Sequence, residues 1–237
     1  MKLLVSAIDC SEARSCIAGG ADIVDVKNPK EGSLGGHSPE VIKSIRKIVP
    51  KSLILSATVG DVPNKPGLVA QAALGLAVSG VDYVKIGLCD HFTVSEAIYL
   101  VRLLVQAVKP VNKKIKVAVC GYADAVLKGY LEPQHIPRIV KEAGAQVAMI
   151  DTLSKGSGKG LFSFLSENEL LSFSRQSHRL GLQVALAGSL NEEDVVRIRD
   201  KKLCDLIGVR TLACRGGKRS STILAPRVKE IKKLLSH

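Results

Sequence analysis

The sequence predicts a single-domain α/β protein, a TIM (β/α)₈ barrel that spans residues 1–237. Three observations predict this fold. Eight short apolar runs recur along the chain, segments of helical period separate them, and polar residues collect where the runs end. A chain of 237 residues with 46% hydrophobic content also suits one barrel better than two small domains.

The eight runs are rich in residues that favour strands. Because such runs are nearly continuous in apolar residues, they fit a parallel sheet that is buried on both faces. Strands that are joined through a helix must pair in parallel. The predicted strands are KLLVSAI (2–8), IVDVK (23–27), LILSATV (53–59), YVKIGL (83–88), IKVAVC (115–120), VAMID (147–151), QVALAG (183–188) and LIGVR (206–210).

Helical periodicity appears in the segments between these strands. Ser38 and Pro39 form the expected helix start, and Gly80, Gly144 and Gly181 stand where helices should end. An open doubly wound sheet, the alternative fold, would carry G-x-G-x-x-G after its first strand, where this chain reads IDCSEARSC. The predicted helices occupy 39–49, 68–80, 93–108, 133–144, 167–181, 191–200 and 225–235.

The long irregular segment Asn28–Ser38 directly follows the second predicted strand. Loops at the carboxyl ends of barrel strands carry function more often than the strands themselves. We therefore expect this segment to act as a lid or a substrate loop.

The chain is basic, with 34 Lys and Arg against 22 Asp and Glu and a formal charge of +12. Such a charge suits nucleic acid, an anionic membrane or phosphorylated metabolites. Aromatic residues make up 3% with no Trp, so the stacking platforms of single-strand binders are missing. We expect a small phosphorylated aldehyde substrate and no nucleic acid, and a basic non-catalytic binding barrel is the alternative from another class.

The amino-terminal residues lack the apolar core of a signal peptide, and no window offers roughly 20 uninterrupted apolar residues. A cytoplasmic protein without membrane contact is expected, and the apolar segment 68–80 would suit a homo-oligomer. The six cysteines form no C-x-x-C pair, and the five histidines show no metal-binding spacing. We expect no metal and no cofactor.

Polar residues stand at the carboxyl ends of the predicted strands, where the loops of a barrel converge around one mouth. Asp25 and Lys27 are two residues apart, so they point to the same face of a strand. A structural ion pair is the alternative interpretation of this spacing. The polar residues at or just beyond strand ends are Asp9, Asp25, Lys27, Thr58, Lys85, Asp151, Lys155, Ser189 and Arg210.

Several ammonium groups in a partly desolvated mouth disfavour one another's charge, so one of them should be an amine at neutral pH. That amine is the nucleophile of Schiff-base chemistry, and Lys27 is the expected one. Asp151 would move protons with Lys155 close behind it, unless Asp151 merely caps the following turn. The sequence GSGKG after these residues does not match a Walker A loop.

Barrels often hold phosphate in the loops after strands seven and eight. Gly188 and Ser189 allow close backbone approach there, and either Arg210 or Arg215 can pair with phosphate oxygens. Asp9, after the first strand, is a further candidate for substrate binding.

With these residues in place, the chain resembles the archaeal-type (5-formylfuran-3-yl)methyl phosphate synthases over essentially its full length. The most specific matching pieces are VSAIDCSEA, GGADIVDVKNPKEGSLG, DYVKIGL and MIDTLSKGSG. The resemblance implies a TIM barrel without a metal. It also implies condensation of two glyceraldehyde 3-phosphate molecules into a phosphorylated hydroxymethyl-furaldehyde for methanofuran biosynthesis, which makes the chain a lyase.

The resemblance further implies that Lys27 forms the Schiff base and that Lys85 transfers protons, with Asp25, Asp151 and Lys155 in support. From the residues alone, the roles of Lys85 and Asp151 can be exchanged. Another class I aldolase that acts on a small sugar phosphate remains the alternative within enzymes, because it would share the lysine and the phosphate site.

Overall fold

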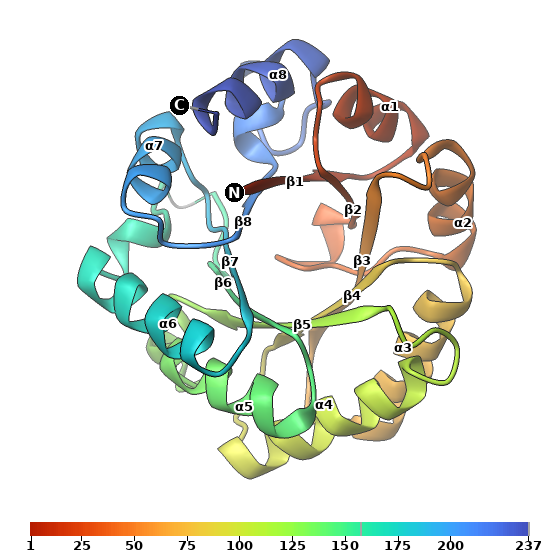
Figure 1. Ribbon diagram of the computed structural model, residues 1–237, viewed down its shortest axis with the longest axis vertical. Helices are drawn as coiled ribbons and strands as arrows, with labels where there is room; N and C mark the ends of the chain where they lie inside the picture. The colour runs from red at the N-terminus through yellow and green to blue at the C-terminus, as the bar shows by residue number, and fades with distance from the viewer. Residues whose placement is uncertain (157, 237) are drawn as a thin grey trace.

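Eight parallel strands close into a barrel, each paired with the next and β8 with β1 (Figure 1). The computed structural model describes residues 1–156 and 158–236. The predicted TIM barrel is therefore confirmed. The strands are β1 (Lys2–Ala7), β2 (Ile23–Val26), β3 (Ile54–Val62), β4 (Tyr83–Leu88), β5 (Lys116–Tyr122), β6 (Val147–Asp151), β7 (Gln183–Leu186) and β8 (Leu206–Val209).

A helix follows each strand, and the helices form the outer ring (Figure 1). Ser38 caps its helix by accepting from the Val41 amide, and Gly144 ends α5 in the left-handed conformation, as predicted. The first helix was not predicted, because the predicted helices begin only at residue 39. The helices are α1 (Cys10–Ala18), α2 (Pro39–Ile48), α3 (Pro66–Val78), α4 (Val94–Val108), α5 (Ile136–Ala143), α6 (Glu167–Arg179), α7 (Glu192–Asp200) and α8 (Ala225–Leu234).

The inner face of the barrel is divided into an apolar floor and a layer that is partly polar. The next inward-facing residue of each strand, two positions further along, forms the layer above the floor. In strands β1 to β4 this residue is polar, whereas in β6 to β8 it is Met149, Ala187 or Gly208. Apolar floor residues include Leu4, Ile23, Tyr83, Ala118, Val147, Ala185 and Leu206. The buried polar residues above it are Ser6, Asp25, Ser56, Thr58 and Lys85.

Strand β3 contains a bulge that changes which side chains face inward. Its register with β4 pairs Thr58 with Lys85 and then Asp61 with Gly87, so three residues on β3 oppose two on β4. Gly60 lies in the bulge with φ +118. Because a bulge shifts the alternation of side chains by one, Asp61 joins Thr58 on the inner face.

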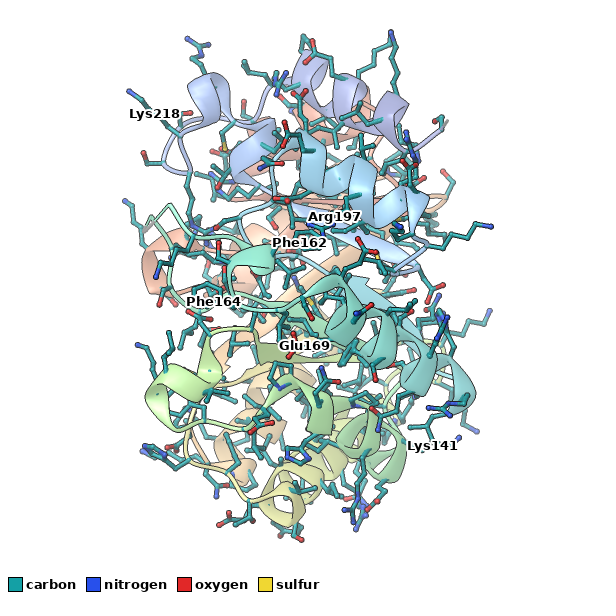
Figure 2. All side chains as sticks on the ribbon, turned by 90° about the vertical axis from the view of Figure 1, so that its left-hand side faces the viewer. Lys141, Phe162, Phe164, Glu169, Arg197 and Lys218 are labelled. Carbon is teal, nitrogen blue, oxygen red and sulfur yellow. The ribbon has the colours of Figure 1, made fainter. Side chains whose placement is uncertain are left out.

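The outer surface is covered by charged side chains from the helices (Figure 2). Arg197 of α7 lies 4.5 Å from the centre of the Phe162 ring, in the loop before α6 (Figure 2). It also pairs at 2.9 Å with Glu167, the first residue of α6, so both contacts join α7 to this part of the chain. In residues 1–156 and 158–236, no helix combines the length and apolarity that a membrane crossing requires.

Candidate active site

A cavity opens at the carboxyl ends of the strands, inside the ring of loops. Its wall brings together residues that are far apart in the chain, as a barrel mouth does. The residues Asn28–Ser38 cover part of this mouth, and the short turn Pro29–Glu31 lies inside the ring beside β2 (Figure 1). The polar side chains that line the cavity are Ser6, Lys27, Lys85, Asp151, Lys155, Ser189, Arg210, Thr211 and Arg219.

Lys27 follows the last residue of β2 and is only 5% exposed. Its Nζ donates a hydrogen bond to the carbonyl oxygen of Ser33 at 3.1 Å. None of the salt bridges among the described residues involves Lys27. Burial lowers the pKa of Lys27 from 10.5 to about 7, with the nearby cations adding to the effect and Asp151 opposing it. About half of the amine is therefore neutral, and so nucleophilic, at pH 7.

Lys85 is held by a carboxylate inside the barrel. Its Nζ lies 2.7 Å from Oδ2 of Asp25, and both side chains are buried. The Ser6 hydroxyl donates to the same oxygen at 3.0 Å. Within the described part of the chain, Oδ1 of Asp25 and the hydroxyl of Ser56 have no hydrogen-bond partner. The sequence placed Asp25 beside Lys27, but its ionic partner in the structure is Lys85.

Asp151 and Lys155 form a second ion pair at the cavity wall. The Nζ of Lys155 lies 2.5 Å from Oδ1 of Asp151 and donates to Oγ1 of Thr152 at 3.0 Å. Burial acts to raise the pKa of Asp151, but Lys155 and Lys27 outweigh it, so that the pKa lies below its usual value. Asp151 is therefore an ionised carboxylate next to the Lys27 amine.

Gly188 and Ser189 lie in the cavity wall as the sequence predicted for the phosphate site. Both residues have positive φ values, 121° for Gly188 and 51° for Ser189. This conformation turns the backbone sharply beyond β7, and a Cβ at Gly188 would lie 3.0 Å from a methyl carbon of Thr152. Close backbone approach to a ligand is thus possible here.

Arg210 lines the cavity but is already occupied. Its guanidinium pairs with Glu12 at 2.7 Å and 3.2 Å and donates to the Ser6 carbonyl at 2.8 Å. Both charged side chains are buried. A buried carboxylate needs such a partner, so Arg210 is committed to the barrel wall and is a poor phosphate ligand.

Two further predicted site residues, Asp9 and Arg215, do not line the cavity in the described structure. Asp9 is exposed and caps α1, because its Oδ1 accepts from the Glu12 amide at 2.8 Å. Arg215 is exposed in the loop after β8. The sequence could not distinguish a helix cap or an exposed loop residue from a cavity residue, because all of them follow the end of a strand.

Arg219 is a cavity residue that the sequence did not single out. Among the described residues, its guanidinium donates to the carbonyls of Gly32 and Ser33, at 3.5 Å and 3.4 Å, and to no carboxylate. Burial lowers the pKa of Arg219, and no salt bridge of the described residues includes it. A half-buried cation without a carboxylate partner suits an anionic ligand. Its position within the basic loop GGKRSS gave no signal that separates it from Arg215.

The model of one protein family, described as 4-HFC-P synthase, matches residues 3–232. The chain belongs to this family. Relatives named (5-formylfuran-3-yl)methyl phosphate synthase include that of Methanocaldococcus jannaschii, 48% identical over 235 residues with 99% of both chains covered. The one from Methanopyrus kandleri is 49% identical over 219 residues, with 92% of both chains covered. The resemblance seen in the sequence is thereby confirmed.

Solved structures support the fold of this 4-HFC-P synthase family member. Phosphoribosyl anthranilate isomerase from Thermotoga maritima superposes with a TM-score of 0.64 at 15% identity, covering 100% of this chain and 98% of the other. Thiamine phosphate pyrophosphorylase from Pyrococcus furiosus gives 0.63 at 12% identity, with 99% and 95% covered. At such identity the likeness concerns the barrel alone. The synthase family itself assigns the chain to the enzymes.

The lowered pKa of Lys27 predicts its reactivity as pH changes. The amine is protonated below its pKa and neutral above it, so labelling by acetic anhydride should increase as pH increases through about 7. A lysine in a short unstructured peptide, added to the same sample, should instead gain reactivity only near the ordinary lysine value of about 10.4. Peptide mass spectrometry after competitive labelling measures Lys27 and the added peptide together. A Lys27 midpoint that coincides with that of the added peptide would contradict the buried amine.

The ion pair of Arg210 predicts a loss of stability. Arg210→Met should lower the free energy of unfolding by about 3–5 kcal/mol, because Glu12 is left buried without a partner. Urea denaturation measures the change. Arg227→Met is the control, since Arg227 pairs with Glu192 and Glu230 at the surface and such pairs contribute about 1 kcal/mol or less. Equal free energies of unfolding in the two variants would contradict a structural role for Arg210.

Proposed function

We propose that the chain condenses two molecules of glyceraldehyde 3-phosphate into 4-(hydroxymethyl)-2-furancarboxaldehyde phosphate through a Schiff base at Lys27, for methanofuran biosynthesis. The observation that carries the proposal is the buried Lys27 amine, which has a pKa of about 7 and lies at the wall of the cavity. The family and the names of its members support the product. Two trioses lose one phosphate and two waters to give this furan.

The first step is the attack of the Lys27 amine on the aldehyde carbon of one triose. A C–N bond forms, the aldehyde oxygen leaves as water, and a positively charged iminium remains. The iminium acidifies the neighbouring carbon, so a base can remove its proton and leave an enamine. The enamine expels its phosphate by breaking the bond from C3 to the phosphate oxygen, and an enol remains on C2 and C3. C3 of this enol adds to the middle carbon of the second triose, after a proton shift has turned its aldehyde into the ketone isomer. The primary hydroxyl of the second triose closes the ring on C2 of the first, two waters leave, and hydrolysis of the imine releases Lys27.

The ion pairs favour Asp151 as the base and Lys85 as the acid, an exchange of the two roles that the sequence left open. Asp151 is ionised and lies near Lys27, so it accepts the proton from the carbon. Lys85 is held against Asp25 and donates protons to the oxygens that leave. Asp25 keeps Lys85 in this place through its Oδ2.

The substrate phosphates bind on the side of the cavity formed by the loops after β7 and β8. The backbone at Gly188 and Ser189 approaches the phosphate closely, as in other barrels with phosphate sites. Arg219 takes the role that was predicted for Arg210 or Arg215, because its guanidinium holds no carboxylate of the described residues. Lys155 adds a second positive charge at the same wall.

Covalent trapping tests the proposal. Borohydride reduction in the presence of glyceraldehyde 3-phosphate should add the mass of the reduced triose to the peptide that contains Lys27. The Lys27→Met variant keeps a side chain of similar length without an amine, cannot form an imine and should show neither adduct nor turnover. In the wild type, triose phosphate alone should yield an ultraviolet-absorbing furan. An adduct at Lys27 without the furan would instead favour another class I aldolase, and no adduct would refute the Schiff base.

The assignment of Arg219 predicts a defect in substrate binding. Arg219→Met should raise the KM for glyceraldehyde 3-phosphate about tenfold or more, since a hydrogen bond to a charged group contributes about 1.5–3 kcal/mol. Inhibition by inorganic phosphate should weaken in parallel. Measuring above pH 8 keeps Lys27 neutral in both proteins. Arg215→Met, in the same loop but exposed, is the control, and an equal KM in both variants would exclude Arg219 as the phosphate ligand.

A further inference from the structure

The peptide that joins Ser33 to Leu34 is held on several sides at the edge of the cavity. The Ser33 carbonyl accepts a hydrogen bond from the Lys27 amine at 3.1 Å, and the Ser33 hydroxyl donates to the Thr152 carbonyl at 2.8 Å. The Leu34 amide donates to both carboxylate oxygens of Asp61 at 3.1 Å. The Leu34 carbonyl accepts from the Thr58 hydroxyl at 3.1 Å. The acceptor of Lys27 thus belongs to a firmly anchored loop.

Asp61 reaches this loop only because of the bulge in β3. Its carboxylate also accepts a hydrogen bond from the hydroxyl of Tyr122, the last residue of β5. Tyr122 is fully buried, and burial together with the neighbouring negative charge of Asp61 raises its pKa well above 10.0. The hydroxyl therefore stays protonated and acts as a fixed donor.

Strand β4 lies between β3 and β5, and Gly87 makes the contact across it possible. A Cβ at Gly87 would lie 1.9 Å from the Tyr122 hydroxyl oxygen and 2.9 Å from Oδ1 of Asp61. Gly32 approaches the carboxylate from the loop, where a Cβ would lie 2.2 Å from Oδ2. Any larger residue at these two positions would displace the carboxylate.

We propose that Tyr122 and Asp61 form a clasp across Gly87 that holds the Ser33–Leu34 peptide, so that the Ser33 carbonyl orients the Lys27 amine. Tyr122 and Asp61 are then positioning residues for the nucleophile, and neither lines the cavity in the described structure. The proposal deepens the Schiff-base function and rests on it for the role of Lys27. It accounts for a buried tyrosine–carboxylate contact that the reaction itself does not use.

A neutral amine needs such an acceptor to be directed. The groups that act electrostatically on Lys27 are Asp151, Lys85, Arg219 and Lys155, and these set its charge. Its hydrogen bond in the described structure goes to Ser33. Displacement of a reacting group by about 1 Å can slow a reaction by about 100-fold, so the placement of this carbonyl matters for the rate of imine formation.

Tyr122→Phe is the central test, because it removes one hydroxyl and keeps the buried ring. Hydrogen exchange of the Leu34 amide should become about tenfold faster or more, because the Asp61 carboxylate that holds it loses its own charged hydrogen bond. Adduct formation at Lys27 should slow about tenfold at saturating glyceraldehyde 3-phosphate, with the apparent Kd unchanged. Gly87→Ala should produce both effects without altering either partner.

Tyr83→Phe is the matched control. Tyr83 is also buried inside the barrel, but its hydroxyl lies 3.4 Å from Gln183 at the opposite end. Unchanged Leu34 exchange in Tyr122→Phe would overturn the clasp. Faster exchange with wild-type adduct formation, or equal slowing in Tyr83→Phe, would overturn the positioning role. If the wild type forms no adduct, the proposed function fails, while Leu34 exchange still decides whether the clasp holds the loop.

Discussion

The site depends on a difference in number between the charged groups at the mouth of the barrel, where three lysines meet two aspartates. Lysine side chains are expensive to bury unless each has a partner. Here Lys85 takes Asp25 and Lys155 takes Asp151, at 2.7 Å and 2.5 Å. Lys27 is left with a carbonyl oxygen, and it is the lysine with the markedly lowered pKa. The neutral amine that the proposed Schiff base needs therefore follows from how partners are distributed among three lysines. Strand register brings Lys85 to Asp25, and the turn after β6 brings Lys155 to Asp151.

The rule that a buried charge needs a partner also explains the different roles of Arg210 and Arg219. Glu12 on α1 is buried and needs a cation, which Arg210 supplies from the end of β8. This pair ties the first helix to the last strand, where the barrel closes. Arg219, nine residues later in the loop, faces the cavity without a carboxylate. One arginine thus stabilises the closed barrel and the other remains available to an anion, although both lie near the same strand end.

Much of this arrangement could be predicted from the sequence, because it follows from regular periods. The alternation of apolar runs and helical segments predicted the barrel, and the period of two placed Asp25 and Lys27 on one face of a strand. The nearness of Lys155 to Asp151 was also predicted, because the two are four residues apart. The pairing of Lys85 with Asp25 could not be predicted, because it depends on registers between strands that are distant in the chain. Asp61 and Tyr122 were missed since the predicted strands ended at 59 and 120, whereas β3 and β5 continue to Val62 and Tyr122. A bulge, which breaks the period, then turned Asp61 inward.

Burial and positioning of the proposed nucleophile are separable in this fold. Burial and the neighbouring cations lower the pKa of Lys27 to about 7, and neither effect sets the direction of the amine. A direction requires a hydrogen-bond acceptor at a fixed place, and a loop supplies one only if its own backbone is held. The bonds from Asp61 and Thr58 to Leu34 provide this, so the irregular segment after β2 is structured by β3 and β5. Because β4 lies between β3 and β5, the contact between Asp61 and Tyr122 requires that Gly87 carry no side chain, and the proposed direction of the Lys27 amine depends on this contact.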